Sequence, residues 1–82
     1  MSDIYNVQQI RQLILERYQR DPKILINVSI AKPRLHLHHV PVEIVGVYAH
    51  IFQIEDTSSG QANRYALQYT DVLTHNIEIL DL

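Results

Sequence analysis

The chain has 82 residues, and its nine acidic and seven basic side chains give a net charge of −2 when the histidines are neutral. This length predicts one domain, residues 1–82, and the negative balance gives no bulk attraction to nucleic acid or to an anionic membrane. The absence of cysteine excludes disulfides, thiol nucleophiles and cysteine-based zinc sites. We expect a cytoplasmic protein, because no apolar run approaches the roughly 18 residues that span a bilayer and the N-terminus lacks the features of a signal peptide.

The first predicted element is an amphipathic helix over about residues 3–19. Ser2 or Asp3 can cap its N-terminus, and Asp21-Pro22 ends it because proline disfavours helical geometry at the residue before it. Apolar side chains at helical spacing define one face, formed by Ile4, Val7, Ile10, Ile14 and Tyr18. We expect this face to pack on the rest of the domain.

From Lys23 to about residue 81 the apolar period becomes two, which predicts strands. Lys32-Pro33-Arg34 is typical of a turn, and Pro41 favours an edge, a bulge or a strand start. The segment 55–63 is polar and contains a glycine, so it predicts a loop. The apolar runs are residues 24–31, 35–39, 42–47, 48–54, 65–70 and 77–80.

These runs predict a mainly β fold with about five short strands after one helix. Parallel pairing needs long crossovers, and the short connections leave no room for them, so the strands must form an antiparallel meander. Short strands with one buried face favour a small SH3-like or Sm-like barrel over residues 23–81, with the helix covering an open end or edge. The alternative is an open antiparallel sheet with the helix across one face.

The segment from Tyr65 to Leu80 predicts a strand, one helical turn and a second strand. Residues 71–74 are too few for an ordinary α-helix and suit a single 3₁₀ turn, with Thr70 or Asp71 as a cap and Leu73 as its anchor in the core. The structural motif consists of Tyr69, Thr70, Asp71, Leu73 and Thr74.

The same segment carries a resemblance. Residues 69–79, YTDVLTHNIEI, resemble the ending of the Veg family, small proteins of Gram-positive bacteria. Residues 2–4 are similar to the opening of that family, and Gly46-Val47 with Phe52 to its middle. The resemblance implies an SH3-type barrel and a non-enzymatic role, linked in the family to biofilm formation and transcriptional control.

The chain departs from the Veg pattern in two places. Veg proteins carry a glycine- and arginine-rich run of the form GGRRK after the first strand, whereas residues 31–39 here contain only Lys32 and Arg34 as basic residues and no glycine. The middle of the chain is also shorter. These differences weaken any contact with nucleic acid that the resemblance implies.

The histidines form the most prominent group of potential metal ligands. His36 and His38 are two apart on a predicted strand and share a face, and His50 or His75 could supply a third ligand. A structural zinc site normally has four ligands, and this spacing is also that of an outward polar face. We therefore expect no metal and no cofactor.

An enzymatic function has little support in the sequence. Glu55-Asp56 lies in a polar loop, where adjacent carboxylates are usually solvated, and capping explains Asp71 without catalysis. There is no nucleophile-elbow pattern, and two glycines cannot form a phosphate-binding loop.

We therefore rank a protein-interaction module first, a nucleic-acid-binding barrel second and a histidine-based metal binder third. Residues 40–42 and the final strand, residues 77–82, are possible edges for a homodimer; any other protein partner is unknown. The aromatic side chains that could stack on bases are Tyr48, Phe52, Tyr65 and Tyr69, although the acidic balance favours a core role for them. The candidate interaction residues are Lys32, Arg34, His36, His38 and Arg64.

Overall fold

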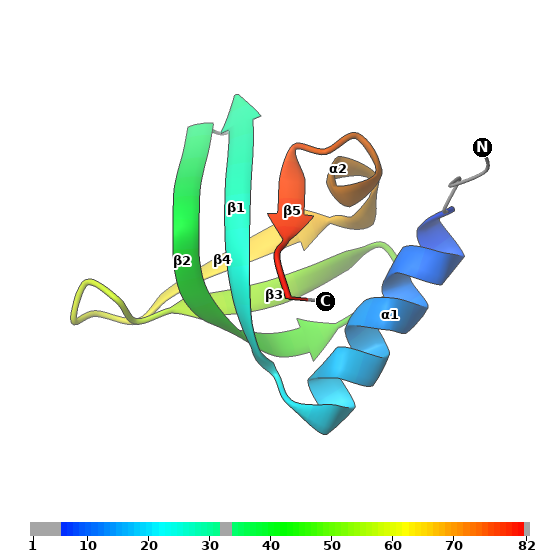
Figure 1. The fold of residues 1–82 in the computed structure, drawn as a ribbon, viewed down its shortest axis with the longest axis horizontal. Helices are drawn as coiled ribbons and strands as arrows, with labels where there is room; N and C mark the ends of the chain where they lie inside the picture. The colour runs from blue at the N-terminus through cyan, green and yellow to red at the C-terminus, as the bar shows by residue number, and fades with distance from the viewer. Residues whose placement is uncertain (1–5, 32–33, 82) are drawn as a thin grey trace.

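The computed structural model describes residues 6–31 and 34–81 and places one helix before a set of antiparallel strands, as the sequence predicts. The elements are α1 (Val7–Arg20), β1 (Lys23–Ala31), β2 (Arg34–Val47), β3 (Ile51–Asp56), β4 (Asn63–Gln68), α2 (Tyr69–Leu73) and β5 (Ile77–Ile79). Figure 1 shows β3 and β4 running across the direction of β1 and β5, so the sheet is strongly bent.

The strand order is β4-β3-β2-β1-β5, which confirms the meander, with the last strand returning to the first. Among the described residues no ladder joins β4 to β5, so the sheet is open. Closure into a barrel stays a prediction. The helix α1 packs on the side of the sheet where the core lies (Figure 1).

The start of α1 differs from the prediction. Ser2 and Asp3 lie outside the described residues, but the helix begins at Val7 because Asn6 is its N-cap. The Asn6 side chain accepts a hydrogen bond from the backbone N–H of Gln9 at 2.9 Å, and the Gln9 side chain accepts one from the N–H of Asn6 at 2.9 Å. This capping box satisfies two free donors at once.

β2 continues through Pro41, whereas the sequence predicts separate runs on either side of it. Pro41 lies opposite Leu25, whose C=O accepts from the N–H of Leu80 at 2.8 Å and whose N–H donates to the Asp81 carboxylate at 3.2 Å. Both polar backbone groups of Leu25 thus face the residues that follow β5, so this pair makes no hydrogen bond between β1 and β2. The proline nitrogen faces the other edge, where β3 pairs only from Glu43 onward, and the predicted edge position is confirmed.

Two bulges bend β2. At the first bulge, His38 and His39 together lie opposite Asn27. His39 has a φ of 51°, and its N–H donates to the Asn27 side chain at 2.7 Å. The predicted alternation therefore ends before His39. The second bulge lies beside Gly46, as predicted, where the ring of Tyr48 would come within 2.6 Å of a Cβ atom.

The predicted 3₁₀ turn is instead a short α-helix, α2. The N–H of His75 donates to the C=O of Val72 at 3.2 Å, and the N–H of Asn76 donates to the C=O of Asp71 at 2.9 Å. With His75 at a φ of 65°, these bonds form a Schellman motif, in which glycine is the usual residue. Sequence spacing did not reveal it because histidine stands in the glycine position.

Neither predicted cap acts at the N-terminus of α2. Gln68 is the N-cap, and no side-chain hydrogen bond caps the helix. The Thr70 hydroxyl donates to the Gln68 side chain at 3.2 Å. Asp71 instead accepts from the Asn76 amide at 3.4 Å through its carboxylate and from the Thr74 hydroxyl at 3.3 Å through its backbone C=O. Both contacts tie the helix to the residues that follow it.

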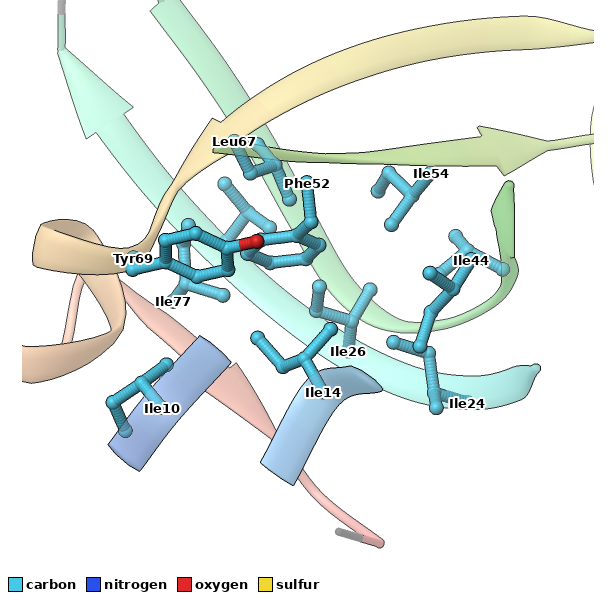
Figure 2. Close-up of a cluster of buried hydrophobic side chains, with 12 residues drawn as sticks. Ile10, Ile14, Ile24, Ile26, Ile44, Phe52, Ile54, Leu67, Tyr69 and Ile77 are labelled. Carbon is cyan, nitrogen blue, oxygen red and sulfur yellow. The ribbon is translucent and has the colours of Figure 1, made fainter. Parts of the chain in front are cut away.

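The core lies between the sheet, α1 and α2 (Figure 2). Leu73, the predicted anchor, is only half-buried, and Tyr69 takes that place. The Tyr69 ring stacks on Phe52 with 5.5 Å between ring centroids, and its hydroxyl donates to the C=O of Tyr48 at 2.6 Å. Burial raises the pKa of the Tyr69 hydroxyl, which keeps it protonated as a donor. The buried hydrophobic residues are Ile10, Ile14, Ile24, Ile26, Val28, Val42, Ile44, Phe52, Ile54, Leu67, Tyr69 and Ile77.

The last turn of α1 holds a buried arginine that the sequence did not reveal. Tyr18, predicted on the apolar face, is exposed, whereas Arg17 is 8% exposed. The Arg17 guanidinium donates to the backbone C=O groups of Asp21 at 2.8 Å and Lys23 at 2.6 Å and to the C=O of Asp81. It also pairs with the Asp81 carboxylate at 3.2 Å. Arg17 thus fastens the end of α1 to the start of β1 and to the C-terminal segment.

Asp81→Asn tests this connection. Partial burial raises the pKa of the Asp81 carboxyl, but hydrogen bonds from the N–H of Leu25 and from Arg17 outweigh it and hold the pKa below its ordinary value of 3.8. The carboxylate therefore stabilises the fold fully above the unfolded-state pKa, and this contribution is lost as the pH falls through the folded-state pKa. In urea melts, Asp81→Asn should lower the free energy of unfolding at neutral pH, and its difference from wild type should shrink towards pH 3.

Glu16→Gln, on the exposed side of α1, is the control for that series, with a small difference from wild type at every pH. A difference for Asp81→Asn that is the same at neutral and at acid pH would contradict the role of the carboxylate.

His75→Gly should stabilise the protein by about 0.5–1 kcal/mol, because glycine adopts the left-handed conformation of that position without a steric penalty. His36→Gly, in the extended part of β2, should destabilise by a similar amount and is the matched control. Thermal or urea melts of both variants measure the difference, and a destabilised His75→Gly protein would contradict the Schellman assignment.

Candidate functional site

A groove of about 540 Å³ lies between the tip of the β1–β2 hairpin and β4. We call it the hairpin–β4 groove. Its lining is Ile30, Arg34 and Leu35 of the hairpin, residues 64–68 of β4, and Asp71 of α2. The hairpin and β4 lie on different sides of β3 in the sheet order, so the groove exists only because the sheet curls.

The groove follows the edge of β4 rather than one of its faces. Successive side chains of a strand point to opposite faces, so a hollow over one face touches every second residue. Here five consecutive residues, 64–68, contribute to the lining. β4 pairs only with β3 among the described residues, and its other edge offers backbone N–H and C=O groups to the groove.

The apolar part of the groove comes from both walls. Leu67 is buried, and Tyr65 is half-buried on the same face of β4. On the hairpin side Ile30 and Leu35 are cross-strand partners, and both are half-buried against the core. Ala66, on the outer face of β4, is exposed and adds little bulk. The groove thus has an apolar inner side and an open outer side.

Two predicted interaction residues meet at this groove, although 30 positions separate them in the chain. Arg64 pairs with Glu55 through Nε and Oε2 at 3.0 Å, whereas Arg34 makes no ion pair with any described residue. Arg64 is the second residue of β4, and Asp71 lies in α2, which begins where β4 ends, so the two ends of β4 carry opposite charges. Lys32, the third basic candidate, lies outside the described residues.

Arg64 also ends a row of charged residues across the sheet. The registers place Lys23 opposite Glu43, Glu43 opposite Glu55, and Glu55 opposite Arg64. The row has cations at its ends and two carboxylates between them. Opposite charges across neighbouring strands favour their register, so Arg64 has a structural role besides any role in binding.

The predicted histidines lie at a different site. His36 and His38 share a hollow of about 190 Å³ with His75, whereas His50 lies in the turn before β3 and does not contribute. In the part of the chain that the structure describes, no three histidine, cysteine or carboxylate side chains come together as a metal site requires. Among the histidines, the two rings in close contact belong to the consecutive residues His38 and His39, with 2.9 Å between His38 Nε2 and His39 Nδ1. The bulge at His39 creates this pair, so spacing alone did not predict it.

Burial limits which aromatic side chains could stack on a base. Phe52 and Tyr69 are fully buried in the core, which excludes them. Tyr48 is 51% exposed, but its ring lies over Gly46. Tyr65 is half-buried in the hairpin–β4 groove. The prediction that the aromatic side chains belong to the core is therefore right for Phe52 and Tyr69.

The edges of the sheet are partly those predicted. β5, within residues 77–82, is an edge strand, and the far side of β2 at residues 40–42 is not covered by β3. The β4 edge was missed, because alternation predicts which residues form a strand but not which strand ends the sheet.

Over the described ranges no helix has the length and apolar character needed to cross a membrane.

Comparisons with known proteins leave the family open. No protein-family model matches the chain, and no curated protein matches it either. The resemblance of residues 69–79 to the Veg family therefore stays a prediction.

Removing either groove arginine should leave the fold intact. The Arg64 side chain is 64% exposed, and exposed ion pairs contribute less than about 1 kcal/mol. Arg34 is exposed at the start of β2, so Arg34→Ala should change the free energy of unfolding by less than about 0.5 kcal/mol. Urea melts of both variants check this, and a cooperative loss of structure in either would show a structural role that its contacts do not explain.

Proposed function

We propose that this chain is a non-enzymatic, regulatory protein-interaction module whose partner binds in the hairpin–β4 groove. One observation carries the proposal: a groove with apolar walls runs along a strand edge that has no neighbour among the described residues. Such edges recognise extended protein segments through backbone hydrogen bonds and side-chain pockets.

The charge pattern favours a protein partner over nucleic acid. A nucleic-acid site gathers basic residues along the path of the phosphates, whereas this groove combines Arg34 and Arg64 with Asp71, and Arg64 is already paired. The chain is acidic overall. Two of the aromatics that could stack on bases are in the core.

A non-enzymatic role is supported by what the groove carboxylate does. The Asp71 carboxylate accepts a hydrogen bond from the Asn76 amide at 3.4 Å at the end of α2, so its position has a structural cause. The lining contains no histidine, serine, threonine or cysteine, and Tyr65 supplies its one hydroxyl group.

We also propose the SH3-like character of the fold and the regulatory context. The curl that brings the hairpin to β4 and the return of β5 to β1 support a barrel-like closure. The resemblance of residues 69–79 to the Veg family supports a role in transcriptional control of biofilm formation. The absence of cysteine agrees with a cytoplasmic place of action.

Site-specific photocrosslinking tests the proposal. Benzoylphenylalanine replaces Gln68, which is exposed in the groove, and in a control protein it replaces Gln19, which is exposed on α1. Both proteins are irradiated in lysate of the source organism, with and without nuclease. We expect a discrete protein adduct from position 68 that nuclease does not change and that position 19 does not give. An adduct that disappears with nuclease, or the same adducts from both positions, would reject the proposed function.

A further inference from the structure

We infer that the hairpin–β4 groove binds an extended segment of another protein as an added antiparallel strand on β4, with a carboxylate of that segment beside Arg34. This inference rests on the proposed function and specifies the partner's chemistry. It assigns three features to the bound segment: backbone pairing, alternating side chains and a fixed direction.

Backbone pairing follows from the state of β4. Every residue from Asn63 to Gln68 is paired with β3 on one side, so the strand is held straight enough to act as a template. The other side has no strand among the described residues, and the groove gives access to it along residues 64–68. An added strand would satisfy the exposed backbone groups at alternate positions.

Alternation of the partner follows from the two faces of β4. Tyr65 and Leu67 face the inner side with the hairpin's Ile30 and Leu35, so partner side chains on that side should be apolar. Ala66 lies in the middle of the outer face and is small and exposed, so it does not obstruct polar partner side chains there. The expected segment alternates apolar and polar residues.

The charges at the two ends of β4 place the ends of the antiparallel segment. Arg64 is the second residue of β4, and Asp71 follows its C-terminal end, whereas Arg34 of the hairpin lines the same groove. A strand antiparallel to β4 has its C-terminal end at Arg64 and its N-terminal end at Asp71. Arg64 favours an acidic side chain near the C-terminal end of the segment, and Arg34, which has no ion pair with a described residue, favours a carboxylate beside it. A basic side chain near its N-terminal end would match Asp71.

Selection from a phage-displayed library of random peptides of about eight residues tests the inference, with the immobilised full chain as bait. We expect enriched sequences that alternate apolar and polar residues, with an acidic residue near the C-terminal end. The most enriched peptide is then synthesised with a fluorophore, and its affinity is measured by anisotropy. Arg34→Glu should weaken it by about tenfold or more, whereas Arg20→Glu, an exposed arginine at the end of α1, should change it less than about twofold.

N-methylation of single peptide amides separates strand addition from docking by side chains alone. Methyl groups on alternate amides should each weaken binding by about tenfold, while those between them should have little effect. A uniform response to methylation, with the position-68 protein adduct still formed, would reject strand addition and leave the proposed function standing. Loss of that adduct would reject the proposed function and the inference together.

Three other results would overturn the inference. The first is a selection with no enrichment, or with enrichment that Arg34→Glu does not change. The second is a consensus with its acidic residue at the N-terminal end, which would reverse the direction. The third is a chain that sediments as a dimer and becomes a monomer with Arg34→Glu, which would make a second copy of this chain the occupant.

Discussion

The bend of β2 is the constraint on which the rest of the structure depends. A flat sheet in the order β4-β3-β2-β1-β5 would hold the hairpin tip and β4 apart, with no shared groove and no enclosed core. The bulges at His39 and before Gly46 provide the bend. Each is supported by a specific contact, the Asn27 side chain on the N–H of His39 and the Tyr48 ring over Gly46.

The C-terminal segment decides which edge of the sheet stays free. β5 pairs with β1, and the two residues that follow it are also held in place. Leu80 donates a hydrogen bond to Leu25, and Asp81 accepts hydrogen bonds from Leu25 and Arg17. Since Arg17 also bonds the backbone between α1 and β1, helix and last strand are fixed to one another. The last strand therefore pairs with β1 and not with β4, and β4 has no second partner strand beyond β3 among the described residues.

The sequence predicted what depends on local periodicity and failed where distant residues decide. The strand β1 has its alternating burial because Ile24, Ile26 and Val28 share one face, and α1 has Ile10 and Ile14 buried at helical spacing. The N-cap at Asn6 could have been found, because the pair Asn6 and Gln9 has capping-box spacing. Other features need contacts that no local pattern encodes.

Three features depend on such distant contacts. They are the buried arginine, the passage of β2 through proline and the groove. Arg17 is buried because carbonyl groups from the α1–β1 connection and from the C-terminal segment meet there. Pro41 is accommodated because β3 does not reach it. Of the predicted interaction residues, the fold brings Arg34 and Arg64 together and places His36 and His38 at a separate hollow, a division that depends on sheet curl.

The electrostatics of the groove favour selectivity over strength. Arg64 already has Glu55, so a partner carboxylate must compete for it, and exposed charge pairs contribute little net free energy. Arg34 lacks such a competitor among the described residues and should decide which segments are accepted. Affinity must then come from the apolar inner side and from the backbone of β4. The contact cannot extend beyond the six residues of that strand. Short contacts of this kind exchange readily, which agrees with the regulatory role that we propose.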